Sequence, residues 1–337
     1  MNLPIKIAGT GLYAPGEPID NAELKRLTAL EFDSDKIEQK IGIYRRHIAR
    51  LRGIDESAAD FATKAALAAL ADAGISADQV GLFIVGTDTP EYISPATAIV
   101  VQGRIQGAET WAQSFDISAS CASFTMAFDA AARIMATQSE IKYALVTGVY
   151  NMPAFIHNDD KFSFPIFADG AAAFVLAANE NSGRSEYIGS QMLTDGTQWD
   201  YIGIYAGGAK NPLSQKMLDE KTHGLLSLKP LPGDRNVRLW PMVIEKILQK
   251  YGTKPEKIDH YIFTQINRSV IVKVMDAIGQ PQEKAHFIMD NYGYTGSACV
   301  PMTFHEGVKS GQIHRGDKAL FIASGSGLAV GSNLFIY

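Results

Sequence analysis

A single cysteine in the segment 115–124 (FDISASCASF) is the residue of this chain best suited to covalent chemistry. Only small residues flank Cys121 on both sides, and the segment changes from an extended pattern to a helical one. This is the pattern of a tight strand-to-helix turn that exposes one nucleophilic side chain. The unpaired N–H groups of a helix N-terminus favour a thiolate. A buried, unreactive cysteine is the alternative, and the residues alone leave both open.

A second candidate is the glycine-rich segment 323–332, which follows an apolar stretch of strand length. Gly325 and Gly327 would let backbone N–H groups come close to a ligand. A simple turn between two strands is the alternative. The pair Gly9 and Gly11 also follows a strand, but the prolines after it exclude the helix that a dinucleotide site needs. The seven histidines are scattered, so we expect no metal site.

Length and composition narrow the class of protein. The 337 residues are 46% hydrophobic with a net charge of −5, which predicts a packed globular enzyme and argues against nucleic-acid binding. Two cysteines cannot form a disulfide framework, which indicates a reducing compartment. No signal-peptide pattern and no apolar run of about 18 residues is present, so we expect a cytoplasmic protein that does not span a membrane.

Strands and helices that could hold these residues alternate along the chain and predict an α/β fold. Helical periodicity over 55–73 ends at Gly74 and precedes a predicted strand over 80–85; a helix over 238–251 ends at Gly252 and precedes a strand over 258–264. Each half closes with an apolar strand, a glycine turn and another apolar strand: 143–148 with 170–176, and 319–324 with 331–336. We therefore expect two copies of one arrangement, related by a pseudo-two-fold axis in a five-layer αβαβα body.

Two further features have less specific interpretations. The run Arg45, Arg46, Arg50 and Arg52 is expected to be a solvated face, with a contact to an acidic carrier protein or to coenzyme phosphates as the alternative. Cys299 occupies the place of Cys121 in the second half and is expected to be a packed, inert thiol.

Several motifs together resemble the β-ketoacyl-acyl-carrier-protein synthase III group of thiolase-fold condensing enzymes. The likeness covers nearly the whole chain and lies in the segments 7–15, 42–49, 116–124, 167–173 and 293–301 and in the Gly325–Gly327 tail. The resemblance implies a thiolase fold with halves 1–178 and 179–337, a homodimer, and an acyl group taken from coenzyme A or a carrier protein onto Cys121. No cofactor other than that phosphopantetheine thioester is implied. The resemblance also implies that the segment Pro212–Pro232 covers the entrance of the site.

The same resemblance suggests roles for other residues. The backbone N–H groups of Cys121 and Gly327 would form the oxyanion hole, and we expect Asn267, Phe155 and Gly325 to contact substrate. Two positions depart from the family pattern. Thr264 replaces a histidine in the segment FTQIN (263–267), and Tyr294 replaces an asparagine in Gly293-Tyr-Thr295.

These departures predict a change in the second half-reaction. In the family the histidine and asparagine stabilise the enolate that forms when a malonyl thioester loses carbon dioxide, and the loss of one such donor costs on the order of 10²–10³ in rate. Acylation of Cys121 needs neither side chain. We therefore expect an acyltransferase of specialised lipid or polyketide metabolism that passes the acyl group to a non-malonyl or pre-activated acceptor, with Thr264 and Tyr294 orienting that acceptor.

Two alternatives stay open at this point. The enzyme could still condense with a malonyl group if Thr264 and Tyr294 supply the two hydrogen-bond donors themselves. The chain could instead be a degenerate, non-catalytic subunit that pairs with an active thiolase-fold partner, although the intact turn around Cys121 argues against this.

Overall fold

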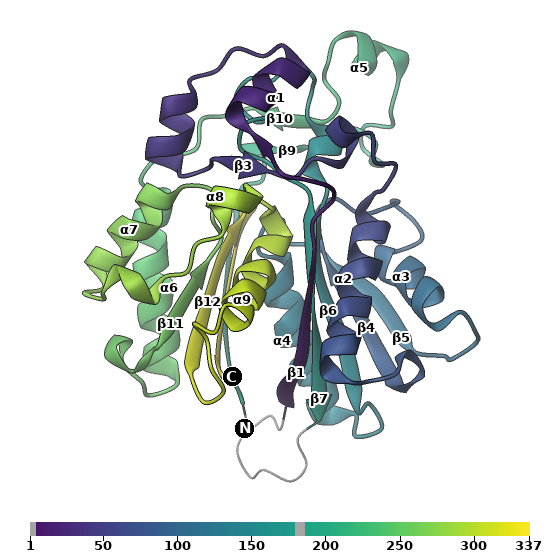
Figure 1. The fold of residues 1–337 in the computed structure, drawn as a ribbon, viewed down its shortest axis with the longest axis vertical. Coiled ribbons are helices and arrows are strands. Elements are labelled where there is room, and N and C mark those ends of the chain that lie inside the picture. The colour runs from purple at the N-terminus through teal and green to yellow at the C-terminus, as the bar shows by residue number, and fades with distance from the viewer. Residues whose placement is uncertain (1–4, 179–185) are drawn as a thin grey trace.

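In the computed structural model, which describes residues 5–178 and 186–337, two β-sheets face each other across a pair of central helices (Figure 1). The first sheet has the strand order β1-β7-β6-β4-β5. Strands β4, β5 and β6 run parallel, whereas β7 is antiparallel to both of its neighbours. Its strands are β1 (Ile5–Tyr13), β4 (Val80–Gly86), β5 (Gln113–Ile117), β6 (Tyr143–Tyr150) and β7 (Gly170–Ala178).

The second sheet repeats this order with one strand fewer. It runs β11-β12-β13-β8, and β11 is parallel to β12. Beyond β11, a single bridge between Tyr261 and Ala285 takes the place that β5 has in the first sheet. Its strands are β8 (Tyr187–Gln198), β11 (His260–Phe263), β12 (Lys318–Gly325) and β13 (Gly327–Ile336).

The predicted repeat between the two halves is present in detail. Gly74 and Gly252 end their helices with positive φ angles of 66° and 63°. Each is followed by a single 3₁₀ turn, Ala77–Gln79 or Pro255–Lys257, and then by a parallel strand. The last strand of the first sheet along the chain, β7, ends at Ala178, and the first strand of the second sheet, β8, begins at Tyr187. The division into halves 1–178 and 179–337 stays a prediction.

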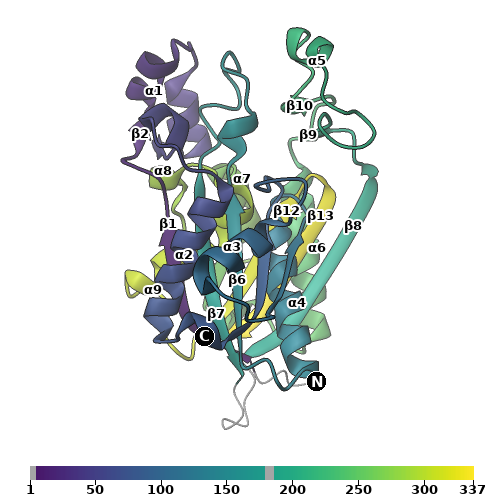
Figure 2. The same ribbon diagram turned by 90° about the vertical axis from the view of Figure 1, so that its right-hand side faces the viewer.

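The helices complete the five-layer αβαβα arrangement, which Figure 1 shows from left to right; Figure 2 looks onto the outer layer that α2 and α3 form. Helices α6 and α7 cover the outer face of the second sheet, α4 and α9 lie between the sheets, and α2 and α3 cover the outer face of the first. The ranges are α2 (Ala58–Ala73), α3 (Thr97–Gln106), α4 (Ser123–Thr137), α6 (Arg235–Lys250), α7 (Arg268–Ala277) and α9 (Cys299–Lys309).

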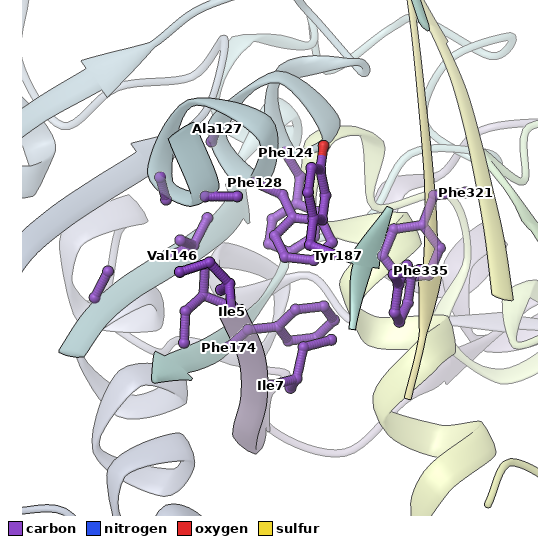
Figure 3. Close-up of a cluster of buried hydrophobic side chains, with 14 of the residues drawn as sticks. Ile5, Ile7, Phe124, Ala127, Phe128, Val146, Phe174, Tyr187, Phe321 and Phe335 are labelled. Atoms are coloured by element: carbon purple, nitrogen blue, oxygen red, sulfur yellow. The ribbon is translucent and has the colours of Figure 1, made fainter. Parts of the chain in front are cut away.

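One aromatic core joins the two sheets (Figure 3). The ring of Phe128 on α4 lies 6.0 Å from Phe174 of β7 and 5.0 Å from Tyr187 of β8. It also lies 6.1 Å from Phe321 of β12 and 5.6 Å from Phe335 of β13. Three of these four contacts are edge-to-face and the one with Phe321 is tilted, and such ring pairs add to the free energy gained by burial. The central helix α4 is therefore fixed against both halves at once.

Smaller elements gather where β4, β6 and β11 end, at the top of Figure 1. Within the described part of the chain, no helix has both the length and the apolar composition that a bilayer crossing requires. These smaller elements are β2 (Ile19–Asp20), α1 (Asn21–Thr28), β3 (Arg45–Arg46), β9 (Ile202–Ile204), α5 (Gln215–Asp219), β10 (Leu225–Ser227) and α8 (Met289–Tyr292).

The prediction of a solvated face for the basic run holds for Arg45 and Arg50, which are exposed, but is wrong for Arg46. The side chain of Arg46 is fully buried and donates hydrogen bonds to the carbonyls of Ile19, at 3.1 Å, and Pro165, at 2.8 Å. Burial lowers the pKa of its guanidinium to about 10. These hydrogen bonds offset part of the cost of removing the guanidinium from water, and they connect the segment around Ile19 to the segment around Pro165.

Candidate active site

The carboxyl ends of four parallel strands place polar side chains around one cavity of about 440 Å³. Asp88 follows β4, Cys121 follows β5, Tyr150 ends β6 and Thr264 follows β11. Parallel strands that end at one edge bring the residues after them together, and ligand sites of α/β folds form there. The described residues that line the cavity include Cys121, Thr264, Tyr294, Gly325 and Gly327 among those proposed from the sequence.

The turn that carries Cys121 is tight and closely packed. Ser120 has a positive φ of 51°, and the N–H of Ala122 donates to the carbonyl of Ala119 at 3.1 Å. A Cβ atom at Gly325 would lie 2.3 Å from that same carbonyl oxygen. Only glycine therefore lets the end of β12 approach the turn. At Gly327 the space is open, but its φ of 123° favours glycine for conformational reasons.

The thiol of Cys121 lies near two phenols, a serine and a carboxylate. The side chains of Tyr150 and Tyr294 interact with its ionisation, and Ser120 Oγ lies 3.8 Å from its sulfur. Burial, followed by the nearby charge of Asp88, raises the pKa of the thiol to about 12. The expected stabilisation of a thiolate by the start of α4 does not prevail here, because desolvation and a like charge outweigh it.

Tyr294 comes from the loop after α8 and is held on both sides. Its N–H donates to the carbonyl of Ile166 at 2.9 Å, and its ring lies 5.5 Å from Phe167 and 6.2 Å from Tyr150. Burial, with a contribution from the charge of Cys121, raises the pKa of the phenol well above its ordinary value. The side chain is thus a neutral O–H donor and cannot act as a base.

Thr264 is fixed by the sheet that it leaves. Its N–H donates to the carbonyl of Ile322 at 3.0 Å, and its Oγ1 accepts the N–H of Ser324 at 3.5 Å. With the oxygen engaged as an acceptor, the hydroxyl proton is the group that can reach a ligand in the cavity. Thr264 can therefore donate one hydrogen bond but cannot exchange a proton near neutral pH.

Sequence reasoning missed Asp88, the one carboxylate among the described residues that line the cavity. Its Oδ2 accepts the hydroxyl proton of Ser120 at 2.8 Å, while its Oδ1 is shielded from solvent and has no hydrogen-bond partner in the described structure. Burial raises the pKa of this carboxyl to about 6. An acidic residue directly after a buried parallel strand was the signal that could have identified it.

The far wall of the cavity comes from residues 199–236 and was predicted only in part. Strands β9 and β10 pair in antiparallel fashion, and Leu225 and Leu231 line the cavity from within the segment expected to cover it. Arg235 and Asn236, from the first turn of α6, complete this wall. Apolar side chains dominate the rest of it, as suits an acyl chain.

Two residues expected to contact substrate lie elsewhere. Asn267 caps α7, where its Oδ1 accepts the N–H of Ser269 at 2.9 Å, and it is not among the residues that line the cavity. Phe155 lines a neighbouring cavity of about 390 Å³ with Arg50 and Gly224. Asparagine is a preferred N-cap, which explains the position of Asn267. Phe155 is partly buried and packs against a hydrophobic cluster. The described geometry gives neither residue a place at Cys121.

Cys299 is the structural counterpart of Cys121 in the second half. It begins α9, as Cys121 precedes α4, but its side chain is buried and its sulfur accepts the N–H of Gln265 at 3.2 Å. Burial raises the pKa of its thiol to about 12. In residues 5–178 and 186–337, no three histidine, cysteine or acidic side chains gather as metal ligands would.

Comparison with known proteins agrees with this geometry. Residues 115–196 match the family described as 3-oxoacyl-[acyl-carrier-protein] synthase III, and residues 248–337 match its C-terminal region. The chain is 31% identical over 329 residues to the β-ketoacyl-[acyl-carrier-protein] synthase III of Clostridium perfringens, with 98% of each chain covered. It is 30% identical to that of Aquifex aeolicus, covering 98% of this chain and 99% of the relative.

Solved structures extend the likeness to the whole fold. The 3-oxoacyl-[acyl-carrier-protein] synthase III of Aquifex aeolicus superposes with a TM-score of 0.83 at 29% identity, covering 99% of this chain and 100% of that one. The priming β-ketosynthase of the R1128 polyketide pathway shares the fold with a TM-score of 0.86 at 24% identity, over 98% and 96% of the two chains. The chain therefore has the thiolase fold and belongs to the 3-oxoacyl-[acyl-carrier-protein] synthase III family of acyl-transferring and condensing enzymes.

Proposed function

We propose that this enzyme loads an acyl group from an acyl thioester onto Cys121 and transfers it to an acceptor other than a malonyl thioester. The acceptor would be a pre-activated carbon nucleophile, an amine, a hydroxyl or a carrier thiol. One observation carries the proposal: the described lining of the Cys121 cavity contains no histidine. The first half-reaction needs the thiol and backbone donors, whereas malonyl decarboxylation needs stronger donors than these.

The apolar wall and the position of the thiol on the cavity support the acylation step. A cavity of about 440 Å³ whose walls are mostly apolar suits an acyl chain, and Cys121 lies among its lining residues. Backbone N–H groups of Cys121 and Gly327 are the proposed oxyanion hole. This reasoning also disfavours a non-catalytic subunit, since such a subunit has no need of a nucleophile that faces an open cavity.

The second half-reaction depends on Tyr294 and Thr264. A phenol occupies space where a smaller amide would leave room for a malonyl group, and a threonine hydroxyl supplies one neutral donor. Both hydroxyls border the cavity, so they are placed to orient an incoming acceptor against the acylated sulfur.

One observation favours a second candidate, a decarboxylative condensation. Thr264 and Tyr294 together offer two O–H donors at the cavity, the same number that a histidine and an asparagine would offer. An enolate oxygen held by two neutral hydroxyls is stabilised less than one held by an imidazole. Slow malonyl turnover is the expected result of that arrangement.

The proposed acyl donors are acyl-coenzyme A or an acyl carrier protein, and the proposed assembly is a homodimer. No cofactor beyond the phosphopantetheine thioester is proposed, and neither a nucleic acid nor a membrane is proposed as a partner. The relatives named above are synthases whose names include the acyl carrier protein, which supports this class of donor.

The test compares carbon dioxide release with acyl transfer in the same preparation. Enzyme acylated with hexanoyl-coenzyme A is mixed with malonyl-coenzyme A, malonyl carrier protein, or a panel of β-keto, amine and hydroxyl acceptors. The proposal expects loss of the acyl group to an acceptor of the panel and negligible carbon dioxide release. Stoichiometric carbon dioxide with a β-keto product would favour the second candidate. Retention of the acyl group with every acceptor, malonyl included, would contradict both.

A further inference from the structure

The proposed acylation of Cys121 requires a group that accepts the proton of its thiol. The thiol must lose its proton to attack a thioester, and its pKa of about 12 makes the spontaneous thiolate rare at neutral pH. Among the described residues that line the cavity, no histidine is available to take that proton. The two phenols beside the sulfur remain neutral because burial raises the pKa of each.

Two polar groups, the hydroxyl of Ser120 and the carboxylate of Asp88, form a path that leads away from the sulfur. Cys121 Sγ lies 3.8 Å from Ser120 Oγ, and Ser120 Oγ lies 2.8 Å from Asp88 Oδ2. Because the single proton of the serine hydroxyl points to the carboxylate, the serine oxygen is left to accept the S–H proton. The directions of the two hydrogen bonds therefore run from sulfur to carboxylate.

We propose that Asp88, acting through Ser120, is the general base that deprotonates Cys121 in the acylation step. The proton of Cys121 moves to Ser120 Oγ as the proton of Ser120 moves to Asp88 Oδ2. The sulfur then bonds to the thioester carbonyl carbon. When the tetrahedral intermediate collapses, the carbon–sulfur bond of the donor breaks, and its thiolate recovers the proton from Asp88 by the reverse path.

The charge of Asp88 couples ionisation of the Cys121 thiol to protonation of the Asp88 carboxylate. Asp88 and Cys121 repel each other when both are anionic, which is one reason why the thiol is hard to ionise. Transfer of the proton to Asp88 leaves one negative charge in the site, as before. The unpartnered Oδ1 of Asp88, shielded from solvent, fits a group that changes its protonation state during turnover.

Other charges around Asp88 do not offer a simpler route. The titratable groups that influence one another at this site are Asp88, Cys121, Tyr150, Tyr294 and Arg235. The guanidinium of Arg235 acts on Cys121 through its charge, but a protonated guanidinium cannot accept the thiol proton. Arg235 also lines the cavity, but its side chain forms no ion pair with Asp88 in the described structure. Asp88 is thus the described anion that a serine hydroxyl connects to the sulfur.

The experiment measures two rates at Cys121 as a function of pH: alkylation by iodoacetamide and acylation by hexanoyl-coenzyme A. For the wild-type protein both rates should rise as Asp88 ionises, with an inflection near its pKa of about 6. Asp88→Asn should lose that inflection and slow both reactions by about 10²–10⁴-fold, the usual range of general-base catalysis. Asp88→Glu should restore part of the rate.

Ser120→Ala tests the connection separately, since it removes only one hydroxyl. It should slow both reactions while keeping the fold, as judged by circular dichroism. Asp159→Asn, in an exposed ion pair with Lys221 away from the cavity, is the matched control and should change neither rate. If Asp88 acted only through its charge, Asp88→Asn would lower the thiol pKa and speed alkylation, and that result would overturn the proposal.

The proposal rests on acylation of Cys121, and the two reagents separate the possible failures. Wild-type protein that reacts with iodoacetamide in the expected pH-dependent way, but never with acyl thioesters, would contradict the proposed function and leave the proton path standing. Wild-type protein that is acylated at the same rate as Asp88→Asn would contradict the proton path alone.

Discussion

At the scale of single residues, the site differs from the family pattern in the groups that surround the nucleophile. Cys121 has two phenols, a serine and the carboxylate of Asp88 around it, and burial together with the charge of that carboxylate keeps its thiol protonated. Such a site favours reactions in which the protein supplies a nucleophile and hydrogen bonds. It disfavours reactions that need an imidazole, which the described lining of the cavity does not contain.

A double substitution tests whether Thr264 and Tyr294 account for the proposed weakness of malonyl decarboxylation. Thr264→His with Tyr294→Asn should raise carbon dioxide release from malonyl-coenzyme A on the order of 10²-fold, the rate effect typical of one oxyanion donor. Each single variant should give less. No gain in a folded double variant would mean that these positions do not limit decarboxylation.

At the scale of elements, the short strands β9 and β10 set the size of the cavity. Leu225 on β10 is buried and borders the cavity, whereas Leu228 just beyond it is 55% exposed. Leu225→Trp should fill part of the space and reduce acylation by long acyl chains by about 10-fold or more relative to acetyl, because apolar pockets discriminate by single methylene groups. Leu228→Trp is the matched control.

Competition among acetyl-, hexanoyl- and decanoyl-coenzyme A, read by the mass of the acylated protein, measures this preference. If wild type and Leu225→Trp show the same preference among the three acyl chain lengths, the acyl chain does not enter the part of the cavity that Leu225 lines.

Most of these elements could be predicted from the sequence because their signals are local. The apolar run 80–85 is long enough for a strand but too short for a helix, and Gly74 ends the helix before it. The contacts of the site are not local. Tyr294 reaches Cys121 only because two sheets converge, and Tyr150 at the end of a buried strand looks like any core aromatic in the sequence.

The two misplaced residues illustrate the same limit. Asn267 directly precedes a helix, where an asparagine side chain satisfies the first free N–H groups, and this local role competes with any role in binding. Phe155 lies close to the site along the chain but faces the neighbouring cavity. Family likeness identifies a segment, whereas the direction of each side chain depends on packing.

At the scale of the whole molecule, the two halves share one core. Phe128 on α4 contacts aromatic rings from both sheets, so neither half buries its inner face alone (Figure 3). We expect a single cooperative unfolding transition, and Phe128→Ala should lower the free energy of unfolding by about 3–5 kcal/mol. Urea titrations followed by circular dichroism and by tryptophan fluorescence should give coincident midpoints. Two transitions, of which only one moves, would indicate independent halves.

The edge of the first sheet is the expected site of dimer formation. Strand β5 pairs only with β4 in the described sheet, and helix α3 packs beside it. Ile93 before α3, Ile99 on α3 and Trp111 before β5 are 82%, 47% and 86% exposed. An unpaired edge with exposed apolar side chains can join a second copy. Light scattering should give twice the chain mass of 36.6 kDa. Ile93→Asp with Ile99→Asp should give monomers, whereas Met242→Asp on α6 should not; a wild-type monomer would contradict the homodimer.

Covalent acylation of Cys121 is the claim on which the account depends, and intact-protein mass spectrometry after incubation with hexanoyl-coenzyme A tests it most directly. The account predicts one added hexanoyl group on the wild-type protein and none on Cys121→Ala. An unmodified wild-type protein, or an adduct that persists in Cys121→Ala, would contradict it.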